Sequence, residues 1–281
     1  TTFVAQDTGM DFIGPYTFCA VRLFLGFLGL LPFFIYFEFN EIKKINFNLK
    51  KVFFFTLILG SIFGMANILQ QVSLLYTDIA NSAVFTVLYV VIVPLISYFI
   101  FSIKIHPSIW PSVTLCLIGG LLLSEIKNYD VRFGDMLVII GAFFWAFHII
   151  FIYKVLKIIN FPIAIATFQC LVAGIFCSFT ALAFETVTIN LISKEITELL
   201  YAGILSSGVA FMLQAYAQRV LSPASVAIIF SLEGVFASIF GWILLDQFLS
   251  EIKVFGIMII LLAVIFSQLI PIYGKKNYGR I

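Results

Sequence analysis

Charged residues are scarce in this 281-residue sequence. Only 11% of the residues are charged whereas 62% are hydrophobic, and the mean hydropathy is +1.14. Soluble domains carry about 25% charged residues, which solvate their surface. A chain with so few charges cannot cover the outside of a soluble fold, so the composition excludes an ordinary soluble protein. The net charge of +2 comes from scattered basic residues, so no nucleic-acid partner is expected.

Several motifs that carry chemistry are missing as well. The sequence contains no GxxxxGK[ST] nucleotide loop, no HExxH and no GxSxG. Its four cysteines lie inside apolar stretches and none has CxxC spacing, so the sequence predicts neither a disulfide framework nor a zinc site. We therefore expect no cofactor, no bound metal and no ATP-driven pump.

Long uncharged stretches dominate what is present. About 20 apolar residues span the hydrocarbon core of a bilayer as a helix. Nine such stretches lie between successive charges, interrupted only by Arg22 in the first and Glu233 in the eighth. They are residues 12–37, 52–77, 79–103, 105–124, 136–153, 158–184, 199–218, 220–245 and 254–274. This pattern predicts an all-α polytopic membrane protein in the lipid bilayer.

The basic residues between the spans predict the orientation in the membrane. If the segment before the first span lies outside, the inside loops hold Lys43, Lys44, Lys50, Lys51, Lys104, Lys154, Lys157, Arg219, Lys275, Lys276 and Arg280. The outside loops then hold only Lys127, Arg132, Lys194 and Lys253. Lysine and arginine concentrate in cytoplasmic loops. We therefore expect a cytoplasmic C-terminus, in a bacterial cytoplasmic (inner) membrane.

The sequence also repeats itself weakly. A shift of 144 residues aligns the spans at 52–77, 79–103 and 105–124 with the last three spans without a gap. Matched positions include Gly64 with Gly208, Gln70 with Gln214, and Tyr89 with Glu233. A shift of 147 residues places Gln169 at the position of Arg22. Because the displacement is five spans, an odd number, we expect residues 1–133 and 134–281 to be two inverted repeats, as in many secondary transporters.

The repeat also makes an expectation about the first residues. Thr1 aligns near His148, halfway along the sixth helix of a ten-helix scheme. We therefore expect residues 1–6 to be the tail of a first helix, so that nine complete spans of two five-helix repeats are present. A nine-span protein with an external N-terminus is the alternative.

Motifs along the whole chain resemble those of a known family. They are Thr2-Phe3-Val4-Ala5-Gln6 with Gly9-Met10, Gly14-Pro15-Tyr16-Thr17-Phe18 with Arg22, Leu88-Tyr89-Val90-Val91 with Pro94, Leu213-Gln214, and Ser231-Leu232-Glu233 followed by Val235-Phe236-Ala237 and Gly241-Trp242. In this order they resemble the EamA-type branch of the drug/metabolite transporter superfamily. The resemblance implies two inverted five-helix repeats, cytoplasmic termini, a central cavity and export of small metabolites. Gly234 stands where the family has proline, so we expect a less kinked helix at Glu233.

Two charged residues lie deep in predicted spans. Glu233 lies near the middle of 220–245, and Arg22 lies a few residues from the centre of its span. A charge there costs about 2.5–3.5 kcal/mol on insertion scales, so it faces a cavity or a partner. Glu233 can carry a proton in each transport cycle, and Arg22 can hold a carboxylate or phosphate bidentately. A structural clamp, with the two residues paired or Glu233 hydrogen-bonded between helices, is the alternative.

Neutral polar residues complete the candidate site. The predicted substrate- or ion-binding residues are Arg22, Asn67, Gln71, Tyr89, His148, Gln169, Gln214 and Glu233. The amides among them can hydrogen-bond a polar ligand or bridge two helices. We expect His148 to be a hydrogen-bonded structural residue rather than a proton site. Gly60 and Gly64 match the small-xxx-small pattern, which favours close helix packing.

The inverted repeat favours a secondary transporter that exports a small polar or amphipathic metabolite, such as an amino-acid-like compound, by alternating access. Proton coupling and a homodimer are left open. One alternative is an intramembrane enzyme on a lipid-linked substrate, with Glu233, His148 and Arg22 as its catalytic set. Another is a structural membrane subunit that transports nothing.

Overall fold

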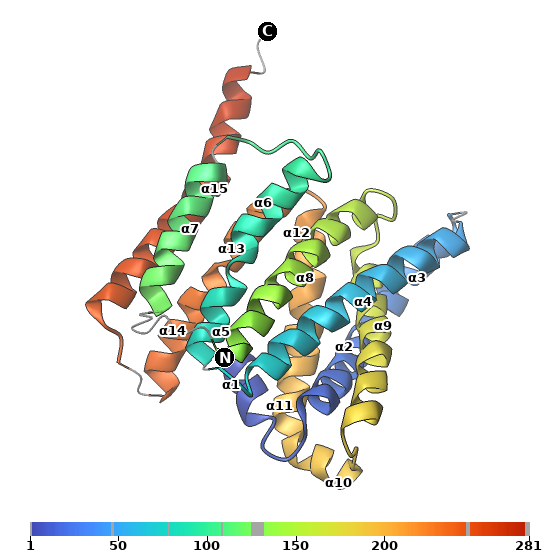
Figure 1. Cartoon of the computed structure of the whole chain (residues 1–281). Helices are drawn as coiled ribbons and strands as arrows, with labels where there is room; N and C mark the ends of the chain where they lie inside the picture. The colour runs from blue at the N-terminus through green and yellow to red at the C-terminus, as the bar shows by residue number, and fades with distance from the viewer. Residues whose placement is uncertain are drawn as a thin grey trace.

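The computed structural model describes residues 2–45, 48–77, 79–107, 109–124, 132–245 and 248–278. Within these ranges it is helical and contains no strand (Figure 1). Eight described segments are long and apolar enough to cross a membrane: Pro15–Phe37, Leu49–Ser73, Ser82–Phe99, Phe133–Leu156, Pro162–Phe184, Ile189–Gln218, Pro223–Phe240 and Glu251–Leu269. A ninth apolar segment, Ile109–Leu123, is shorter. The chain is therefore an all-α, polytopic, integral membrane protein.

The helices follow the predicted spans within a few residues. The first half contains α1 (Thr2–Thr8), α2 (Pro15–Phe37), α3 (Phe39–Lys43), α4 (Leu49–Ser73), α5 (Ile79–Thr86), α6 (Tyr89–Phe99) and α7 (Ile109–Ser124). The second half contains α8 (Phe133–Leu156), α9 (Pro162–Phe184), α10 (Ile189–Ile192), η1 (Ser193–Glu195), α11 (Ile196–Leu200), the π-helix η2 (Tyr201–Ala210), α12 (Phe211–Gln218), α13 (Pro223–Phe230), α14 (Leu232–Leu245) and α15 (Glu251–Tyr278). At 16 residues, α7 is about 24 Å long, shorter than the 20 residues predicted for this span.

Local sequence explains where several helices begin. Proline occupies the first turn of α2, α9 and α13, where its missing N–H costs no hydrogen bond. The side chains of Asn48 and Ser222 cap α4 and α13 by accepting hydrogen bonds from the N–H groups of Lys51 and Ser225, each at 3.2 Å.

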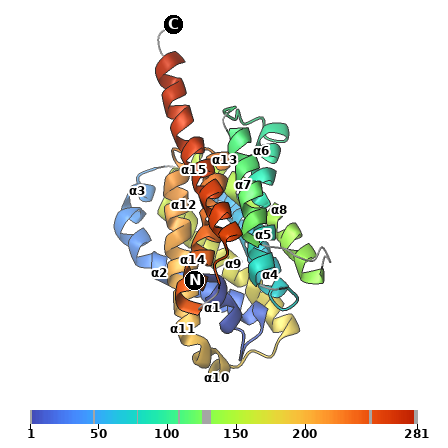
Figure 2. The same ribbon diagram turned by 90° about the vertical axis from the view of Figure 1, so that its left-hand side faces the viewer.

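Corresponding helices of the two halves run in opposite directions. In Figure 1, α2 and α5–α6 run upward, whereas their repeat partners α9 and α13–α14 run downward. Likewise α7 runs downward and α15 upward, and the two lie side by side in Figures 1 and 2. The inverted orientation predicted from the repeat is therefore present. The boundary placed between residues 133 and 134 stays a prediction.

Two glutamates cap the central helix pair reciprocally. Glu38, which follows α2, accepts hydrogen bonds from the N–H groups of Ile163 at 3.1 Å and Ala164 at 2.7 Å in the first turn of α9. Glu185, which follows α9, accepts from the N–H groups of Tyr16 at 2.9 Å and Thr17 at 2.8 Å in the first turn of α2. A carboxylate at a helix N-terminus accepts hydrogen bonds from the free N–H groups and interacts favourably with the positive end of the helix dipole. The two glutamates are 147 positions apart, which is the shift of the repeat.

Glycines allow the central helices to approach closely, as the small-xxx-small pattern predicted. A Cβ atom at Gly60 of α4 would lie 2.5 Å from the Cβ of Val172 on α9. One at Gly64 would lie 3.4 Å from the Cα of Ala173 on α9. On the related surface, a Cβ at Gly208 of η2 would lie 3.4 Å from the carbonyl oxygen of Gly26 on α2. Glycine is required here because two backbones nearly touch.

Two spans are interrupted at equivalent places in the two halves. The span at 79–99 is interrupted between α5 and α6 at residues 87–88, and the span at 223–245 is interrupted between α13 and α14 at Ser231. At this position the hydroxyl of Ser231 donates to the carbonyl of Ile228 at 2.6 Å, a local hydrogen bond of the kind that competes with helical ones. This interruption lies three residues before Gly234, and Ser231 itself keeps right-handed helical angles, φ −60° and ψ −17°. The expectation that Gly234 leaves this helix less kinked therefore stays a prediction.

Most basic residues lie at one end of the bundle. We call this the basic end; it is the upper end in Figure 1, where α3, α6, α8 and α12 terminate. It holds Lys43, Lys44, Lys50, Lys51, Lys104, Lys154, Lys157 and Arg219. Arg132, Lys194 and Lys253 lie at the opposite end, while Lys127 and Arg280 fall outside the described residues. Among the described residues, the basic residues that the sequence assigned to the inside loops thus lie at one end of the bundle, and those assigned to the outside loops lie at the other.

Candidate functional site

A cavity lies between the two halves of the chain. It comprises about 540 Å³ of space, its mouth included. Its lining residues are Thr2, Gln6, Arg22, Asn67, Gln70, Thr86, Tyr89, Trp145, Ile149, Ser206, Ser207, Phe211, Phe230 and Glu233. Four of the eight predicted site residues are therefore brought together: Arg22, Asn67, Tyr89 and Glu233.

The cavity lies toward the end opposite the basic end. Arg22 is seven residues from the start of α2, which places it about 10 Å along that helix from the opposite end. Asn67 lies six residues before the end of α4, about 9 Å from the same end. Gln6, in the short helix α1, also lines the cavity at this end. This position suits a site that is reached from the face opposite the basic loops.

Arg22 is the buried cation of the cavity. Its side chain is 2% exposed, and its Nη2 donates to Oδ1 of Asn67 at 2.5 Å. Asn67 is itself held, because its Nδ2 donates to the carbonyl of Phe63 at 2.7 Å. The Nε of Arg22 is buried without a hydrogen-bond partner. Asn67 thus fixes the guanidinium while leaving a donor for a ligand.

Glu233 lines the same cavity from the other half of the chain. Its side chain is exposed, and it also borders a recess lined by Thr2, Phe3, Phe236, Ala237 and Phe240. Within the described part of the chain, the ion pair found is that of Lys44 with Glu41. Arg22 and Glu233 are therefore not paired with each other, so the clamp in which they pair is not formed.

Other polar groups of the cavity were not among the predicted residues. Nε1 of Trp145 donates to Oε1 of Gln70 at 3.1 Å, which fixes the indole ring in the wall. Oε1 of Gln6 is buried without a partner, as is the hydroxyl of Tyr89, which was among the predicted residues. The repeat match between Gln70 and Gln214 was a signal for Gln70. Small residues such as Ser207 carry no comparable signal, because serine is common in membrane helices.

Gln71 is placed behind the cavity. It is fully buried, and its Nε2 donates to the backbone carbonyl of Gln6 at 2.7 Å. This hydrogen bond joins α4 to α1. Gln71 therefore supports a helix that lines the cavity, rather than lining it directly.

A layer of aromatic rings closes the cavity on the side of the basic end. The rings of Trp145 and Phe211 are stacked, with their centroids 5.7 Å apart and an interplanar angle of 9°. The centroid of the Phe63 ring lies 4.6 Å from that of Phe211. We call Phe63, Trp145 and Phe211 the aromatic layer. His148 stacks on Phe63 at 4.7 Å and does not line the cavity.

The remaining three predicted residues lie on the far side of this layer. Nε2 of His148 is 3.0 Å from Oε1 of Gln169, and Nε2 of Gln214 donates to Oε1 of Gln218 at 3.4 Å. We call His148, Gln169 and Gln214 the inner cluster. His148 is hydrogen-bonded, as expected. The catalytic alternative requires Arg22, Glu233 and His148 in one cavity. His148 does not line the cavity that contains the other two.

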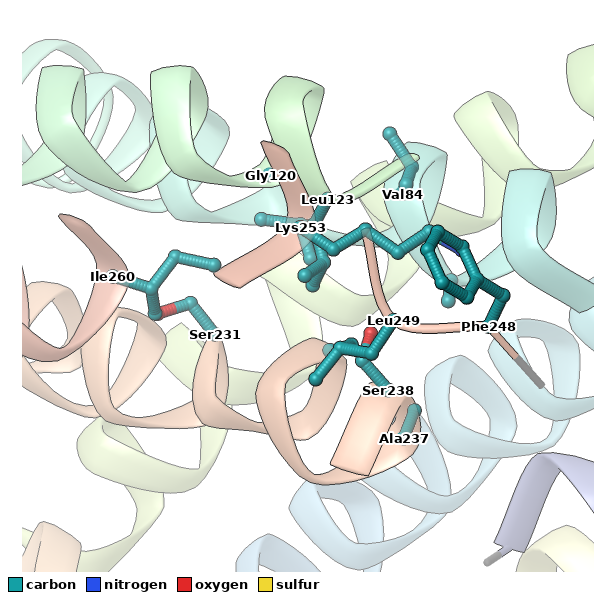
Figure 3. Close-up of a pocket in the computed structure, with 13 residues that line it drawn as sticks. Val84, Gly120, Leu123, Ser231, Ala237, Ser238, Phe248, Leu249, Lys253 and Ile260 are labelled. Carbon is teal, nitrogen blue, oxygen red and sulfur yellow. The ribbon is translucent and has the colours of Figure 1, made fainter. Parts of the chain in front are cut away.

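A second pocket lies apart from this cavity. Figure 3 shows a separate pocket of about 780 Å³ between α5, α7, α14 and α15; Lys253, Ser231 and Ser238 are its polar side chains in a largely apolar wall. It contains none of the predicted site residues.

Among the residues that the structure describes, no group of three or more His, Cys, Asp or Glu side chains is placed to hold a metal ion. The four cysteines are buried and free.

Comparison with known proteins identifies the family. The sequence model of the EamA-like transporter family matches residues 1–125 and 132–269. The chain belongs to the EamA-like transporter family. The resemblance seen in the motifs is thereby confirmed, and this EamA-like protein is a membrane transporter.

Two relatives and one solved structure place the EamA-like protein more closely. An uncharacterized transporter of Archaeoglobus fulgidus is 30% identical over 273 residues, covering 96% of this chain and 82% of the relative. The uncharacterized transporter YoaV of Bacillus subtilis is 26% identical over 271 residues, covering 92% and 89%. A crystal structure with 13% identity matches 96% of both chains with a TM-score of 0.75, which shows a shared fold.

Proposed function

We propose that this EamA-like protein is a secondary active transporter that exports a small polar or amphipathic metabolite by alternating access between its two inverted repeats. The observation that supports this proposal is the cavity between the halves. One half contributes Arg22 and the other contributes Glu233, and no ion pair joins them. Charges inside a membrane protein that face a cavity mark a substrate or ion pathway.

The lining favours a substrate with an anionic group and an apolar part. The free Nε of Arg22 can donate to a carboxylate or phosphate, since guanidinium remains charged at all physiological pH values. The hydroxyl of Tyr89 offers a second hydrogen bond. Trp145, Phe211 and Phe230 supply an apolar wall. An amino-acid-like compound has this combination of groups.

Glu233 is the residue we assign to coupling. It lies in the first turn of α14, two residues after the interruption at Ser231, and its exposed side chain lines the cavity. A carboxyl group at this place can exchange a proton with the cavity as the helix moves. Transport of one substrate molecule outward would then be exchanged for one or more protons moving inward, with the basic end in the cytoplasm.

The enzymatic alternative is not favoured by this geometry. It needs His148 beside Glu233, but His148 lies behind the aromatic layer and is bound to Gln169. A structural subunit would have no need of a buried arginine with a free donor, because such an atom costs about 1–3 kcal/mol unless a ligand satisfies it.

Flux in proteoliposomes tests the proposal. Vesicles containing the protein are loaded with a panel of labelled amino acids and other metabolites, and the efflux of each compound is measured. Loss of a charged hydrogen bond costs about 1.5–3 kcal/mol, so Arg22→Gln should reduce transport of an anionic substrate about tenfold or more. Arg219→Gln is the matched control, because Arg219 is exposed at the basic end. Equal transport by wild type and Arg22→Gln would contradict the assigned role.

A further inference from the structure

The inner cluster is only partly hydrogen-bonded although it is buried. Nδ1 of His148, Nε2 of Gln169 and Oε1 of Gln214 have no partner among the described residues. The three side chains are 0%, 0% and 2% exposed. Each buried, unsatisfied polar atom costs about 1–3 kcal/mol, and such atoms are few in folded proteins. Three of them together point to groups that bind something in another state of the molecule.

The inner cluster lies on the basic-end side of the cavity, separated from it by the aromatic layer. His148 follows Trp145 by one turn of α8, and Gln214 follows Phe211 by one turn of α12. Both turns run toward the basic end, so the cluster is reached from the cavity by passing the aromatic layer. The hydrogen bond of Gln218 to the carbonyl of Ile149, at 2.8 Å, joins α12 to α8 at this level.

The repeat relates the cluster to the cavity. Gln169 takes the position of Arg22, and Gln214 takes the position of Gln70. Arg22 and Gln70 line the cavity that lies toward the opposite end. In a transporter built of inverted repeats, an exchange of conformation between the halves forms the equivalent cavity at the other end. The residues that would line it include Gln169 and Gln214.

We infer that His148, Gln169 and Gln214 form a second polar binding site, which lines the pathway when the transporter opens toward the basic end. The inference rests on the proposed function. The site offers hydrogen-bond donors and acceptors with no permanent charge, because neutral Gln169 stands where the other half has Arg22. It therefore takes water and the neutral hydrogen-bonding groups of the substrate. The anionic group is left to Arg22, on the cavity side of the aromatic layer.

Cysteine accessibility tests this inference without a known substrate. Gln214→Cys and, separately, Gln169→Cys are introduced into the full chain and treated with the charged thiol reagent MTSET in membrane vesicles of both orientations. Ala215→Cys is the matched control, because Ala215 is the next residue of α12, is fully buried, and packs in an apolar cluster with Leu59 and Ile152. The native cysteines are buried, and unmodified protein gives their background.

The expected result is modification of Gln214→Cys or Gln169→Cys from the basic-end side at about tenfold or more the rate of Ala215→Cys. Rates equal to that of Ala215→Cys in both variants, in protein that elutes as a single species in detergent, would overturn the inference, since static helix bridging predicts this. Failure here leaves the flux experiment unaffected. Flux without such labelling would reject the second site alone, whereas the absence of flux would count against the proposed function and against the inference that rests on it.

Discussion

At the scale of single residues, the two membrane charges were predictable and their surroundings were not. Arg22 and Glu233 interrupt long apolar stretches, so the cost of a charge in lipid identifies them from sequence alone. The hydrogen bond from Arg22 to Asn67 and the one from Trp145 to Gln70 depend on how α2, α4 and α8 pack. Sequence spacing places residues on a helix face, but it does not say which face meets the cavity.

The same limit explains the split among the predicted amides. Asn67 lines the cavity, Gln71 supports α1, and Gln169 lies behind the aromatic layer. All three are neutral amides in apolar helices, so the sequence offered no means of separating them. Their roles follow from the rotation of each helix, which glycine contacts and aromatic packing determine.

Glu38 gives a residue-scale prediction on pH. Burial raises the pKa of its carboxyl group above the ordinary 4.5, although the N–H groups of Ala164 and Ile163 act in the opposite direction. The folded state therefore holds this proton more tightly than the unfolded state, so ionisation costs stability as the pH rises through and above 4.5. Relative to Glu38→Gln, the wild type should lose stability as the pH rises from below to above 4.5.

Thermal unfolding in detergent across this pH range measures the effect. Glu41→Gln is the control, because Glu41 is exposed and its pair with Lys44 is a surface ion pair. Glu41→Gln should follow the wild type at every pH. A difference between Glu38→Gln and the wild type that stays constant with pH would contradict the account of Glu38.

At the scale of elements, the charge pattern predicted the spans, but the breaks within two of them were not predicted. Uncharged length alone places the spans within about five residues of their helices, except the one predicted at 199–218, whose helical segment begins at Ile189. The interruption at Ser231 was not predicted, because the expectation for this helix rested on Gly234, three residues later along the chain. The reciprocal caps of Glu38 and Glu185 were also missed, since each joins residues more than 100 positions apart.

The α4–α9 contact gives a prediction on stability. A methyl group at Gly60 would lie 2.5 Å from the Cβ of Val172, so Gly60→Ala forces the two helices apart. Overpacking of this kind costs about 1–3 kcal/mol. Gly141→Ala is the control, because its new methyl group would meet the Cβ of Leu69 at an ordinary 3.5 Å. Thermal unfolding should show a lower midpoint for Gly60→Ala only; equal midpoints for the two variants would refute the packing account.

At the scale of the whole molecule, the inverted repeat organises both the fold and the site. The shift of 147 residues relates the caps of Glu38 and Glu185, and the shift of 144 residues relates the contacts of Gly64 and Gly208, although sequence identity between the halves is weak. The cavity and the inner cluster lie on opposite sides of the aromatic layer, at related positions of the two halves. Sequence could predict the pairing of positions. It could not predict at which end of the bundle the cavity lies, because related positions of both halves carry polar residues.

Orientation in the membrane is a prediction at this scale. The basic end should face the cytoplasm, since lysine and arginine are retained there. A green fluorescent protein fused to the C-terminus should fluoresce in a bacterial host, and alkaline phosphatase fused there should be inactive. Fusions placed after Val187, in the loop between α9 and α10, should give the reverse pattern. Active phosphatase at the C-terminus would invert the predicted orientation and with it the predicted direction of export.

The measurement that tests the central claim most directly compares driven flux with exchange in Glu233→Gln. In proteoliposomes, a pH gradient should stimulate export by the wild type. Glu233→Gln should lose this stimulation while still exchanging labelled for unlabelled substrate, because the cavity and Arg22 are intact. Glu251→Gln, at the exposed start of α15, should behave as the wild type. Gradient-driven export that persists in Glu233→Gln would contradict the assignment of proton coupling to this carboxyl group.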